Sequence, residues 1–286
     1  MEELFKKLGQ IKGATPLSWS RVNLLLNICP YQWYHKYVAK TAASYSAEPV
    51  AMLAGKAIHE VLEKVMDRCI IYGFSEEAAC YDRFFTQQKK LLESTPEVLC
   101  AFEELKEPTR ITLGKLLRSA DKFHAKVSAE QKLILTKDAR PAQSRFTKWN
   151  DTGWIGYIDL EMYAGGKLLI IDYKSEHYTQ EREASVREQT EMYAYAEFLR
   201  IPQLQTVQTG CAYLKDSTIK MDEPISRDSL PEIRHTLTEL YTRYMEKILS
   251  DEFEPRASKY CAWCGYTGIC PLRSCKDGES HEESEG

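Results

Sequence analysis

A hairpin near the middle of the chain constrains the fold more than any other feature. Gly165-Gly166 separates two apolar runs, one ending at Ala164 and the other beginning at Lys167. Both glycines can adopt the positive φ that a two-residue primed turn requires, so the two runs are predicted to pair as antiparallel strands. This register places Asp159 opposite Asp172.

Two opposed carboxylates repel each other unless a cation lies between them. Directly opposed side chains have Cβ atoms roughly 4.5–5.5 Å apart, a distance at which like charges are destabilising. Lys174 follows Asp172 by two positions and therefore points to the same face of the strand, and Glu161 shares the face of Asp159 by the same alternation. Two carboxylates and a lysine on one sheet face favour metal-dependent hydrolysis of phosphodiester bonds.

The composition is that of an ordinary globular protein, with 43% apolar and 28% charged residues. No apolar run approaches the roughly 18 residues of a membrane span, and the acidic start is unlike a secretory signal. Nine cysteines without a signal for export favour reduced thiols and metal binding over disulfides. We therefore expect a cytoplasmic protein with no membrane partner.

The net charge of −4 is confined to one end of the chain. Residues 276–286 contain five acids and one lysine, which leaves the rest of the chain neutral. Residues 272–286 are therefore predicted to be a disordered acidic tail. The net charge thus says little about nucleic-acid binding, which depends on local basic patches.

The periodicity of apolar residues predicts an α/β fold, with a central mixed sheet flanked by helices. Helices are predicted over residues 18–29, 55–72, 183–199 and 230–249, with charged helical sequence continuing from the second of these to about 127. Strands are predicted over residues 132–137, 144–149, 153–162, 167–174, 206–214 and 218–221.

The C-terminal cysteines have the spacing of a metal site. Cys261 and Cys264 form a CxxC pair, and Cys270 follows in a loop with two glycines. A zinc ribbon needs a second CxxC pair, which the chain lacks, so an iron–sulfur cluster is favoured over zinc. The spacing leaves the fourth ligand open between Cys29, which precedes a proline, and Cys275. The other four cysteines are predicted to be buried small side chains: Cys69, Cys80, Cys100 and Cys211.

Together these motifs resemble the iron–sulfur branch of the PD-(D/E)xK nuclease superfamily. That branch includes the RecB-like exonucleases associated with CRISPR adaptation and the nuclease domain of AddB. The resemblance covers residues 18–271, and the matching segments are, in order, Cys29, Gly55-Lys56-Ala57-Ile58-His59, Asp159, Asp172-Tyr173-Lys174, Gln189-Thr190-Glu191-Met192-Tyr193 and Cys261/Cys264/Cys270. The chain departs from the consensus at Ile158, where the family has proline, and at Asp172, where many members have glutamate.

The resemblance implies a restriction-endonuclease-like core in a single nuclease domain, residues 1–271. Residues 73–130 would form a helical insertion, while residues 18–40 and 255–271 would form a region that binds a [4Fe–4S] cluster. Cys29 would be its fourth ligand, beside Cys261, Cys264 and Cys270. The cluster would then clamp the two ends of the chain together.

By the same resemblance, Asp159 and Asp172 would bind Mg²⁺ or Mn²⁺, with His59 and the backbone carbonyl of Tyr173 completing the metal shell. Lys174 would position the attacking water or stabilise the transition state.

Gln189 and Tyr193 are four residues apart and share one helix face. The resemblance implies that this pair supports the catalytic lysine and contacts DNA.

Basic and aromatic residues alternate near the N-terminus and suggest contacts with DNA phosphates and bases. The candidate phosphate contacts are Arg21, Lys36 and Lys56. Trp33, Tyr34 and Tyr37 would offer stacking surfaces or, equally, form a core around the cluster. No pattern indicates base reading, so DNA binding is expected to be independent of sequence.

The leading hypothesis is a metal-dependent DNA exonuclease that acts on ends or single strands in repair, recombination or CRISPR adaptation. Two alternatives stay open: a structure-selective endonuclease of the same fold, and a DNA-binding scaffold subunit of a larger complex. Besides DNA, the expected partners of this protein are other proteins of recombination or CRISPR adaptation.

Overall fold

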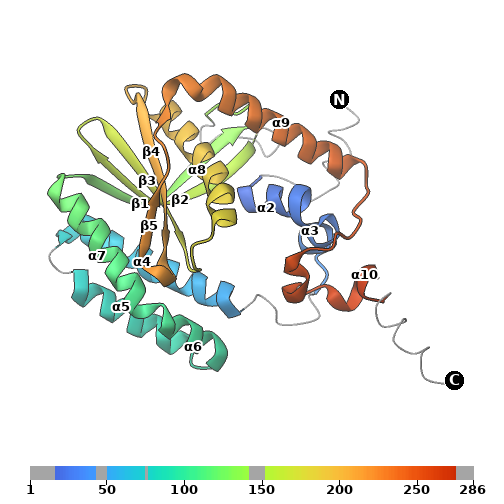
Figure 1. Ribbon diagram of the computed structural model, residues 1–286, viewed down its shortest axis with the longest axis horizontal. Helices are drawn as coiled ribbons and strands as arrows, with labels where there is room; N and C mark the ends of the chain where they lie inside the picture. The colour runs from blue at the N-terminus through green and yellow to red at the C-terminus, as the bar shows by residue number, and fades with distance from the viewer. Residues whose placement is uncertain (1–16, 43–49, 75–76, 142–151, 275–286) are drawn as a thin grey trace. The chain divides into compact units, whose positions relative to one another are not determined.

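The computed structural model describes residues 17–42, 50–74, 77–141 and 152–274 (Figure 1). The chain divides into two compact units. The first, which we call the sheet unit, comprises Pro49–Ile134 and Gly156–His235. The second, which we call the cysteine unit, comprises Met1–Glu48, Leu135–Ile155 and Thr236–Gly286. The single nuclease domain stays a prediction, and residues 275–286 of the predicted acidic tail lie outside the described residues.

The described residues form one sheet of six strands in the order β1-β2-β3-β4-β5, with β6 paired to β4. β3 runs parallel to β4, whereas β2 pairs antiparallel with β3 and β5 with β4, so the predicted α/β fold with a mixed sheet is confirmed. The strands are β1 (Lys126–Thr136), β2 (Thr152–Ala164), β3 (Lys167–Lys174), β4 (Thr206–Tyr213), β5 (Thr218–Met221) and β6 (Ile225–Ser226).

The β2–β3 hairpin forms as the glycine pair predicts. Gly165 and Gly166 have φ values of +55° and +76°, which a side chain would disfavour, and Ala164 pairs with Lys167. The register then continues to Leu160 opposite Ile171.

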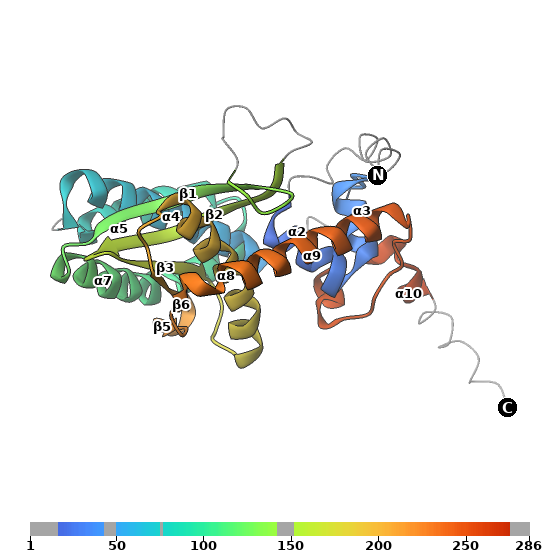
Figure 2. The same cartoon turned by 90° about the horizontal axis from the view of Figure 1, so that it is seen from above.

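Helices cover both faces of the sheet (Figure 2). The helices of the sheet unit are α4 (Val50–Tyr72), α5 (Glu77–Leu91), α6 (Pro96–Glu104), α7 (Lys106–Lys122) and α8 (Gln180–Arg200). Helices α4 to α7 share one core with Leu160, Ile171 and Tyr173. Val186 of α8 packs on Cys211 and Tyr213, which point to the opposite face because side chains alternate along β3 and β4.

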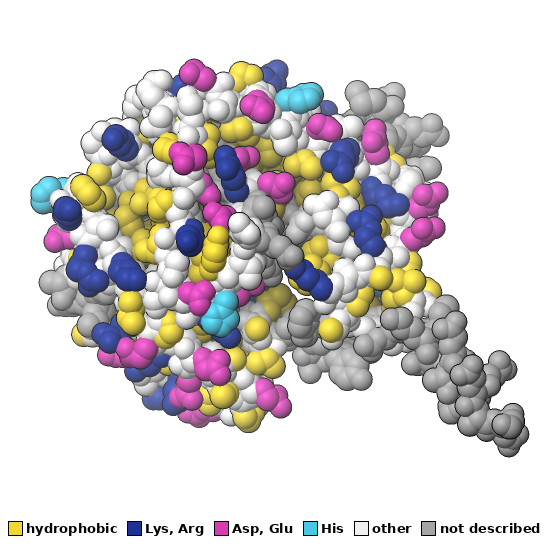
Figure 3. Space-filling model, in the orientation of Figure 1, with side chains coloured by type: hydrophobic (Ala, Val, Ile, Leu, Met, Phe, Trp, Pro, Cys, Tyr) yellow, Lys and Arg dark blue, Asp and Glu magenta, His cyan; other side chains and the backbone are white. Residues whose placement is uncertain are grey.

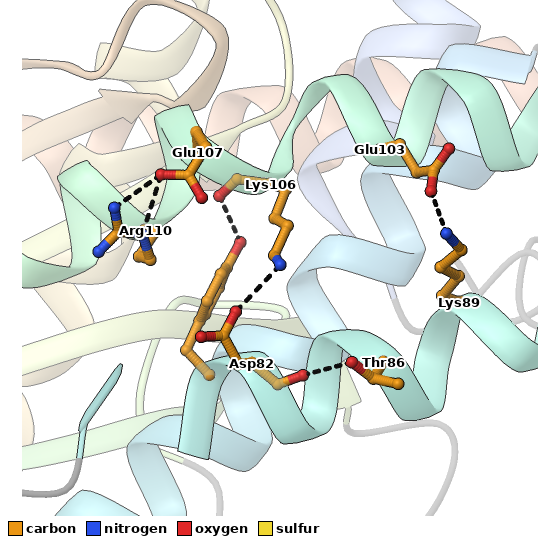
Figure 4. A network of polar contacts seen from close by, with 8 residues as sticks. Asp82, Thr86, Lys89, Glu103, Lys106, Glu107 and Arg110 are labelled. Carbon is orange, nitrogen blue, oxygen red and sulfur yellow. Dashed lines mark hydrogen bonds and ion pairs between the residues drawn. The ribbon is translucent and has the colours of Figure 1, made fainter. Parts of the chain in front are cut away.

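Helices α5 to α7 lie within residues 73–130, and that this segment is an insertion stays a prediction. Their core is apolar, with the rings of Phe85 and Phe102 stacked at a centroid distance of 4.2 Å. Ion pairs cross their surface, including Lys106–Asp82 at 3.1 Å and Lys89–Glu103 (Figure 4). Exposed pairs of this kind contribute little, typically about 0–1 kcal/mol each, so buried apolar contacts stabilise these helices.

The described part of the cysteine unit includes a helical region that is interrupted at Cys29, whose backbone is extended. It consists of α2 (Trp19–Asn23), the π-helix η1 (Leu24–Ile28) and α3 (Pro30–Tyr37). Ser18 caps α2 and its hydroxyl accepts from the N–H of Arg21, as the sequence predicts for a helix start. Trp33 is fully buried, stacked on Phe253 and edge-on to Tyr244 of α9 (Leu230–Leu249).

Several predicted boundaries need correction. Helix α4 begins five residues before the predicted start at Gly55, and α8 is longer than predicted at both ends. The helical region ends at Lys122 rather than about Val127, because β1 already begins at Lys126, six residues before its predicted start. The strand predicted over 144–149 lies outside the described residues. Among the described helices, none combines the length and the apolar character that crossing a bilayer requires.

Candidate active site and cysteine cluster

Asp159 lies where β2 and β3 separate. Their pairing ends at Leu160 and Ile171, so Asp159 and Asp172 are not the ladder pair that the turn register predicts. Instead, Oδ2 of Asp159 accepts a hydrogen bond from the backbone N–H of Tyr173 at 2.6 Å. This hydrogen bond uses a backbone N–H near the end of the β2–β3 ladder. It fixes the orientation of the Asp159 carboxylate and allows the two strands to diverge.

Asp172 is the centre of a polar network between β3 and α8. Its side chain is 3% exposed, and Oδ2 lies 2.5 Å from Nζ of Lys174. Gln189 donates from Nε2 to Oδ1 of Asp172 at 3.2 Å and accepts from Nζ of Lys174 at 3.4 Å. The same amide donates to the hydroxyl of Tyr193 at 2.5 Å. Among the predicted site residues, these contacts thus bring together Asp172, Lys174, Gln189 and Tyr193.

His59 reaches the site from α4. Its Nδ1 lies 3.6 Å from Oδ1 of Asp159, and its ring meets the ring of Tyr173 edge-on. Gly55 precedes it by about one turn and explains why the motif begins with glycine. A Cβ at Gly55 would lie 2.4 Å from Oγ of Ser175, so the glycine allows α4 to approach the end of β3.

The ionisable groups of the site shift one another's pKa values. Burial opposes ionisation of Asp159, but His59, the N–H of Tyr173 and Lys174 together lower its pKa below the usual value. For Asp172, burial outweighs the attraction of Lys174 and raises the pKa. Burial disfavours the charged forms of His59 and Lys174, yet the aspartates raise both of their pKa values. The two aspartates therefore lose their protons in separate steps.

The donor set fits a hard divalent cation. Oδ2 of Asp172 is buried and has no aligned hydrogen-bond donor among the described residues, although Nζ of Lys174 is close. Carboxylate oxygens are the ligands that Mg²⁺ and Mn²⁺ prefer. Within the described ranges, however, no three His, Cys, Asp or Glu side chains are already arranged to hold a metal ion.

Glu161 lies on the same sheet face but contacts a different set of residues. It accepts from the hydroxyl of Ser128 at 2.9 Å and from Arg200 at 3.0 Å, and it is 2% exposed. Burial and the neighbouring carboxylate of Glu197 raise its pKa from 4.5 to about 7. Its hydrogen bonds are with Ser128 and Arg200 rather than with groups of the active site.

The raised pKa of Glu161 predicts a pH-dependent stability. The folded protein keeps this proton up to about pH 7, whereas the unfolded chain releases it near pH 4.5, so the stability should fall as the pH rises between these values. Glu161→Gln should abolish this loss and stabilise the protein at pH 8 by up to about 3 kcal/mol. Denaturant unfolding at pH 5 and pH 8 measures the effect, with the exposed Glu103→Gln as control. Equal pH dependence in Glu161→Gln and the wild type would contradict the prediction.

Four cysteines of the cysteine unit come within electrostatic range of one another at Cys264. Cys29 links η1 to α3, and the three C-terminal cysteines lie in and after the short helices η6 (Lys259–Trp263) and η7 (Thr267–Ile269). Burial raises the pKa of the Cys264 thiol, and Cys29, Cys261 and Cys270 raise it further. The four thiols predicted as ligands are therefore electrostatic neighbours, while Cys275 lies outside the described residues.

Hydrogen bonds connect the segments that carry these cysteines. The guanidinium of Arg256 donates to the carbonyl of Leu26 at 2.9 Å, and its backbone N–H approaches Sγ of Cys29 at 3.5 Å. The hydroxyl of Tyr31 donates to the carbonyl of Ile269 at 2.6 Å. These contacts join residues 26–31 to residues 256–269.

The remaining cysteines divide into two groups. Cys69, Cys80 and Cys211 are buried, as predicted. Cys100 is exposed, so that prediction is wrong. It lies on the solvent side of α6, because this helix buries Val98 and Phe102 instead.

The proposed DNA contacts lie in different units. Arg21 and Lys36 both approach the ring of Tyr37, at 4.4 and 5.5 Å, in the cysteine unit, whereas Lys56 is exposed on α4. Trp33 and Tyr34 pack on Phe253, as expected for core residues. Positive and negative side chains are mixed over the face in Figure 3.

Glu130 lies within electrostatic range of the site but has no signal in the sequence. It lies in β1 with a positive φ of +48° and is half-buried. Burial, followed by the charges of Asp159 and Glu63, raises its pKa to about 7. The start of β1 does not show a clear strand pattern, so the alternation that would have placed this acid near the site is absent.

Comparisons with known proteins gave matches to a family model and to solved structures. A family model for the PD-(D/E)XK nuclease superfamily matches residues 16–271. A Eubacterium rectale protein described as a putative exonuclease has a similar structure, with a TM-score of 0.50 and 12% identity over 92% of this chain and 88% of that one. The structure of SSO0001 aligns with a TM-score of 0.43 and 12% identity, over 95% of this chain and 93% of that one. No curated protein gives a significant match.

Proposed function

The chain belongs to the PD-(D/E)XK nuclease superfamily, and from this premise we propose that it is a metal-dependent DNA exonuclease that hydrolyses phosphodiester bonds at ends or in single strands. The observation that carries the proposal is the connected set of Asp159, Asp172, Lys174 and Gln189 at the point where β2 and β3 separate. A scaffold subunit would not need a partly buried lysine balanced against a buried aspartate, since a charge that loses water without a partner is costly.

Asp159, Asp172, His59 and the carbonyl of Tyr173 would hold the Mg²⁺ or Mn²⁺ ion. When bound, the ion activates water and neutralises charge on the phosphate. The N–H of Tyr173 fixes the orientation of Asp159. Gln189 contacts both Asp172 and Lys174 and thereby holds the lysine within reach of the reacting phosphate.

Lys174 would stabilise the charge that develops in the transition state. Its pKa is raised by Asp172, which outweighs the opposing effect of burial, so the ammonium remains charged in the neutral range where cleavage would be assayed. Nζ already lies beside the metal-binding carboxylate. A cation in this position acts on the reacting phosphate without itself ligating the metal.

Lys174→Ala should therefore separate catalysis from metal binding. Removing one electrostatic stabiliser typically lowers the rate by about 10²–10³. Mn²⁺ binding, measured by calorimetry, should persist or strengthen, because Asp172 loses the ammonium that competes for Oδ2. Loss of Mn²⁺ binding in this variant would show that the role assigned to Lys174 is wrong.

The proposal includes a structural [4Fe–4S] cluster held by Cys29, Cys261, Cys264 and Cys270. The mutual proximity of these thiols and the softness of thiolate ligands support it. It also includes a cytoplasmic role in repair, recombination or CRISPR adaptation.

A degradation assay tests the proposed activity. End-labelled single- and double-stranded linear DNA and covalently closed circles are incubated with and without Mn²⁺. An exonuclease shortens linear DNA only and requires the metal. Nicking of closed circles would favour the structure-selective endonuclease, and binding without cleavage would favour the scaffold subunit.

A further inference from the structure

The connections that follow β3 and β4 begin next to each other. The two strands run parallel, and their last paired residues are Lys174 and Tyr213. Because parallel strands end at the same edge of a sheet, both connections start at that edge. β3 leads through residues 175–179 into α8, whereas β4 leads into the 3-10 helix η4 (Leu214–Asp216). The connection that follows Lys174 therefore borders η4.

One carboxylate of η4 joins the two connections. Oδ2 of Asp216 accepts a hydrogen bond from the backbone N–H of Tyr178 at 2.6 Å, and Oδ1 lies 2.6 Å from Nδ1 of His177. The N–H of Tyr178, followed by His177, lowers the pKa of Asp216 below its usual value, so the carboxylate is ionised at neutral pH. Hydrogen bonds to an ionised acceptor are shorter and stronger than neutral ones.

Helix α7 anchors the turn that follows η4. Ser217, which has a φ of +50°, donates from its hydroxyl to the carbonyl of Pro108 at 2.9 Å. Lys115 donates from Nζ to the carbonyl of Ser217 at 2.8 Å. The turn that presents Asp216 is therefore attached to a helix of the sheet unit by two hydrogen bonds.

Tyr178 connects this anchored turn to the start of α8. Its hydroxyl donates to Oε2 of Glu183, in the first turn of the helix, at 2.5 Å. Its ring meets the ring of Tyr213 edge-on at 5.2 Å and packs against the cluster that includes Val186 of α8. The position of Tyr178 therefore sets where α8 begins.

Helix α8 also contains Gln189, which donates to Asp172 at 3.2 Å and accepts from Lys174 at 3.4 Å. Both distances are near the upper limit for a hydrogen bond, so a small shift of α8 would break these contacts. Support of Lys174 by Gln189 thus depends on how firmly α8 is held.

We propose that Asp216 is a positioning residue of the candidate active site: it fixes the connection between β3 and α8, and so holds Gln189 against Lys174. The inference rests on the proposed function, because it concerns the same lysine. Asp216 acts through α8 and takes no part in the reaction itself.

Steady-state cleavage of end-labelled linear DNA with Mn²⁺ tests this role. Asp216→Ala should lower kcat by about 10-fold or more, because a small displacement of a catalytic group is costly. KM should stay within about two-fold of the wild type, since Asp216 does not bind the substrate. Asp216→Asn should restore most of the rate, because its Oδ1 can still accept from the N–H of Tyr178.

Asp82→Ala is the matched control. It removes a partly exposed aspartate that is also paired with a cation, but from α5, and it should cleave at the wild-type rate. Wild-type kcat in Asp216→Ala, or no rescue by Asp216→Asn, would overturn the inference.

A double substitution separates positioning from general destabilisation. If Asp216 acts through Gln189, adding Asp216→Ala to Gln189→Ala should lower kcat by less than about two-fold further, because the supported contact is already lost. Two independent losses that multiply would contradict the assignment.

Hydrogen exchange measured by NMR needs no enzymatic activity. The N–H of Tyr178 should exchange at least about 10-fold faster in Asp216→Ala, and close to the wild-type rate in Asp216→Asn. If the wild type cleaved no DNA, the proposed function would fail. An unchanged exchange rate at Tyr178 in Asp216→Ala would instead overturn the anchoring by Asp216.

Discussion

Asp159→Asn should abolish DNA cleavage while leaving the protein folded. The asparagine keeps an oxygen that can accept from the N–H of Tyr173, so the local backbone contact survives. The negative charge that would bind the cation is lost, and the rate should fall by about 10³ or more. The stability should fall modestly without loss of the fold, because His59, the N–H of Tyr173 and Lys174 stabilise the charged form of Asp159 and lower its pKa.

Cleavage of end-labelled linear DNA with Mn²⁺ measures the loss, and anisotropy in EDTA shows that DNA binding persists. Asp82→Asn is the matched control, since it removes the same charge from the surface of α5, where Asp82 pairs with Lys106. Near-normal cleavage by Asp159→Asn would show that the active site has been placed wrongly.

Local chemistry explains which parts of this site could be predicted from the sequence. Turn geometry depends on the two residues of the turn, so Gly165-Gly166 predicts the correct hairpin register. Helical periodicity likewise depends only on spacing, and it correctly places Gln189 and Tyr193 on one face, where they share a hydrogen bond.

Tertiary contacts decide the features that the sequence does not predict. The β2–β3 ladder stops before Asp159, whose carboxylate accepts a hydrogen bond from the N–H of Tyr173. The alternation of side chains along a strand does not reveal that a side chain binds this backbone group. The left-handed conformation of Glu130 likewise has no signal in its residue type, since glutamate rarely adopts a positive φ. Cys100 shows that residue type alone can also mislead, because cysteine is usually buried. Helix α6 buries the face that contains Val98 and Phe102, so Cys100 is exposed to solvent.

Loss of any of Cys29, Cys261, Cys264 or Cys270 should yield a colourless and destabilised or insoluble protein. Cys29 precedes Cys261 by more than two hundred residues, so shared ligation would close most of the chain into one loop. By analogy with a disulfide, a crosslink of this length restrains the unfolded chain by about 5 kcal/mol. The contacts of Arg256 and Tyr31 would remain, but hydrogen bonds of this kind contribute only about 0.5–3 kcal/mol each.

The wild type purified without oxygen should be brown, with about four irons and broad absorption near ~400 nm from thiolate-to-iron charge transfer. Cys100→Ser is the matched control: this thiol is exposed on α6, so the variant should keep both its colour and its stability. A colourless wild type that holds one zinc would refute the cluster.

Cys275→Ser tests the choice of the fourth ligand. Cys29 is an electrostatic neighbour of Cys264, and the backbone N–H of Arg256 approaches the Cys29 thiol. Cys29 is therefore placed to be the fourth ligand without Cys275. Cys275→Ser should therefore remain brown and unfold at the wild-type temperature. A bleached Cys275→Ser beside a brown Cys29→Ser would reverse the assignment. In that case the cluster would close only a short C-terminal loop. Loss of the cluster would then destabilise the protein far less, because closing a short loop removes little conformational entropy from the unfolded chain.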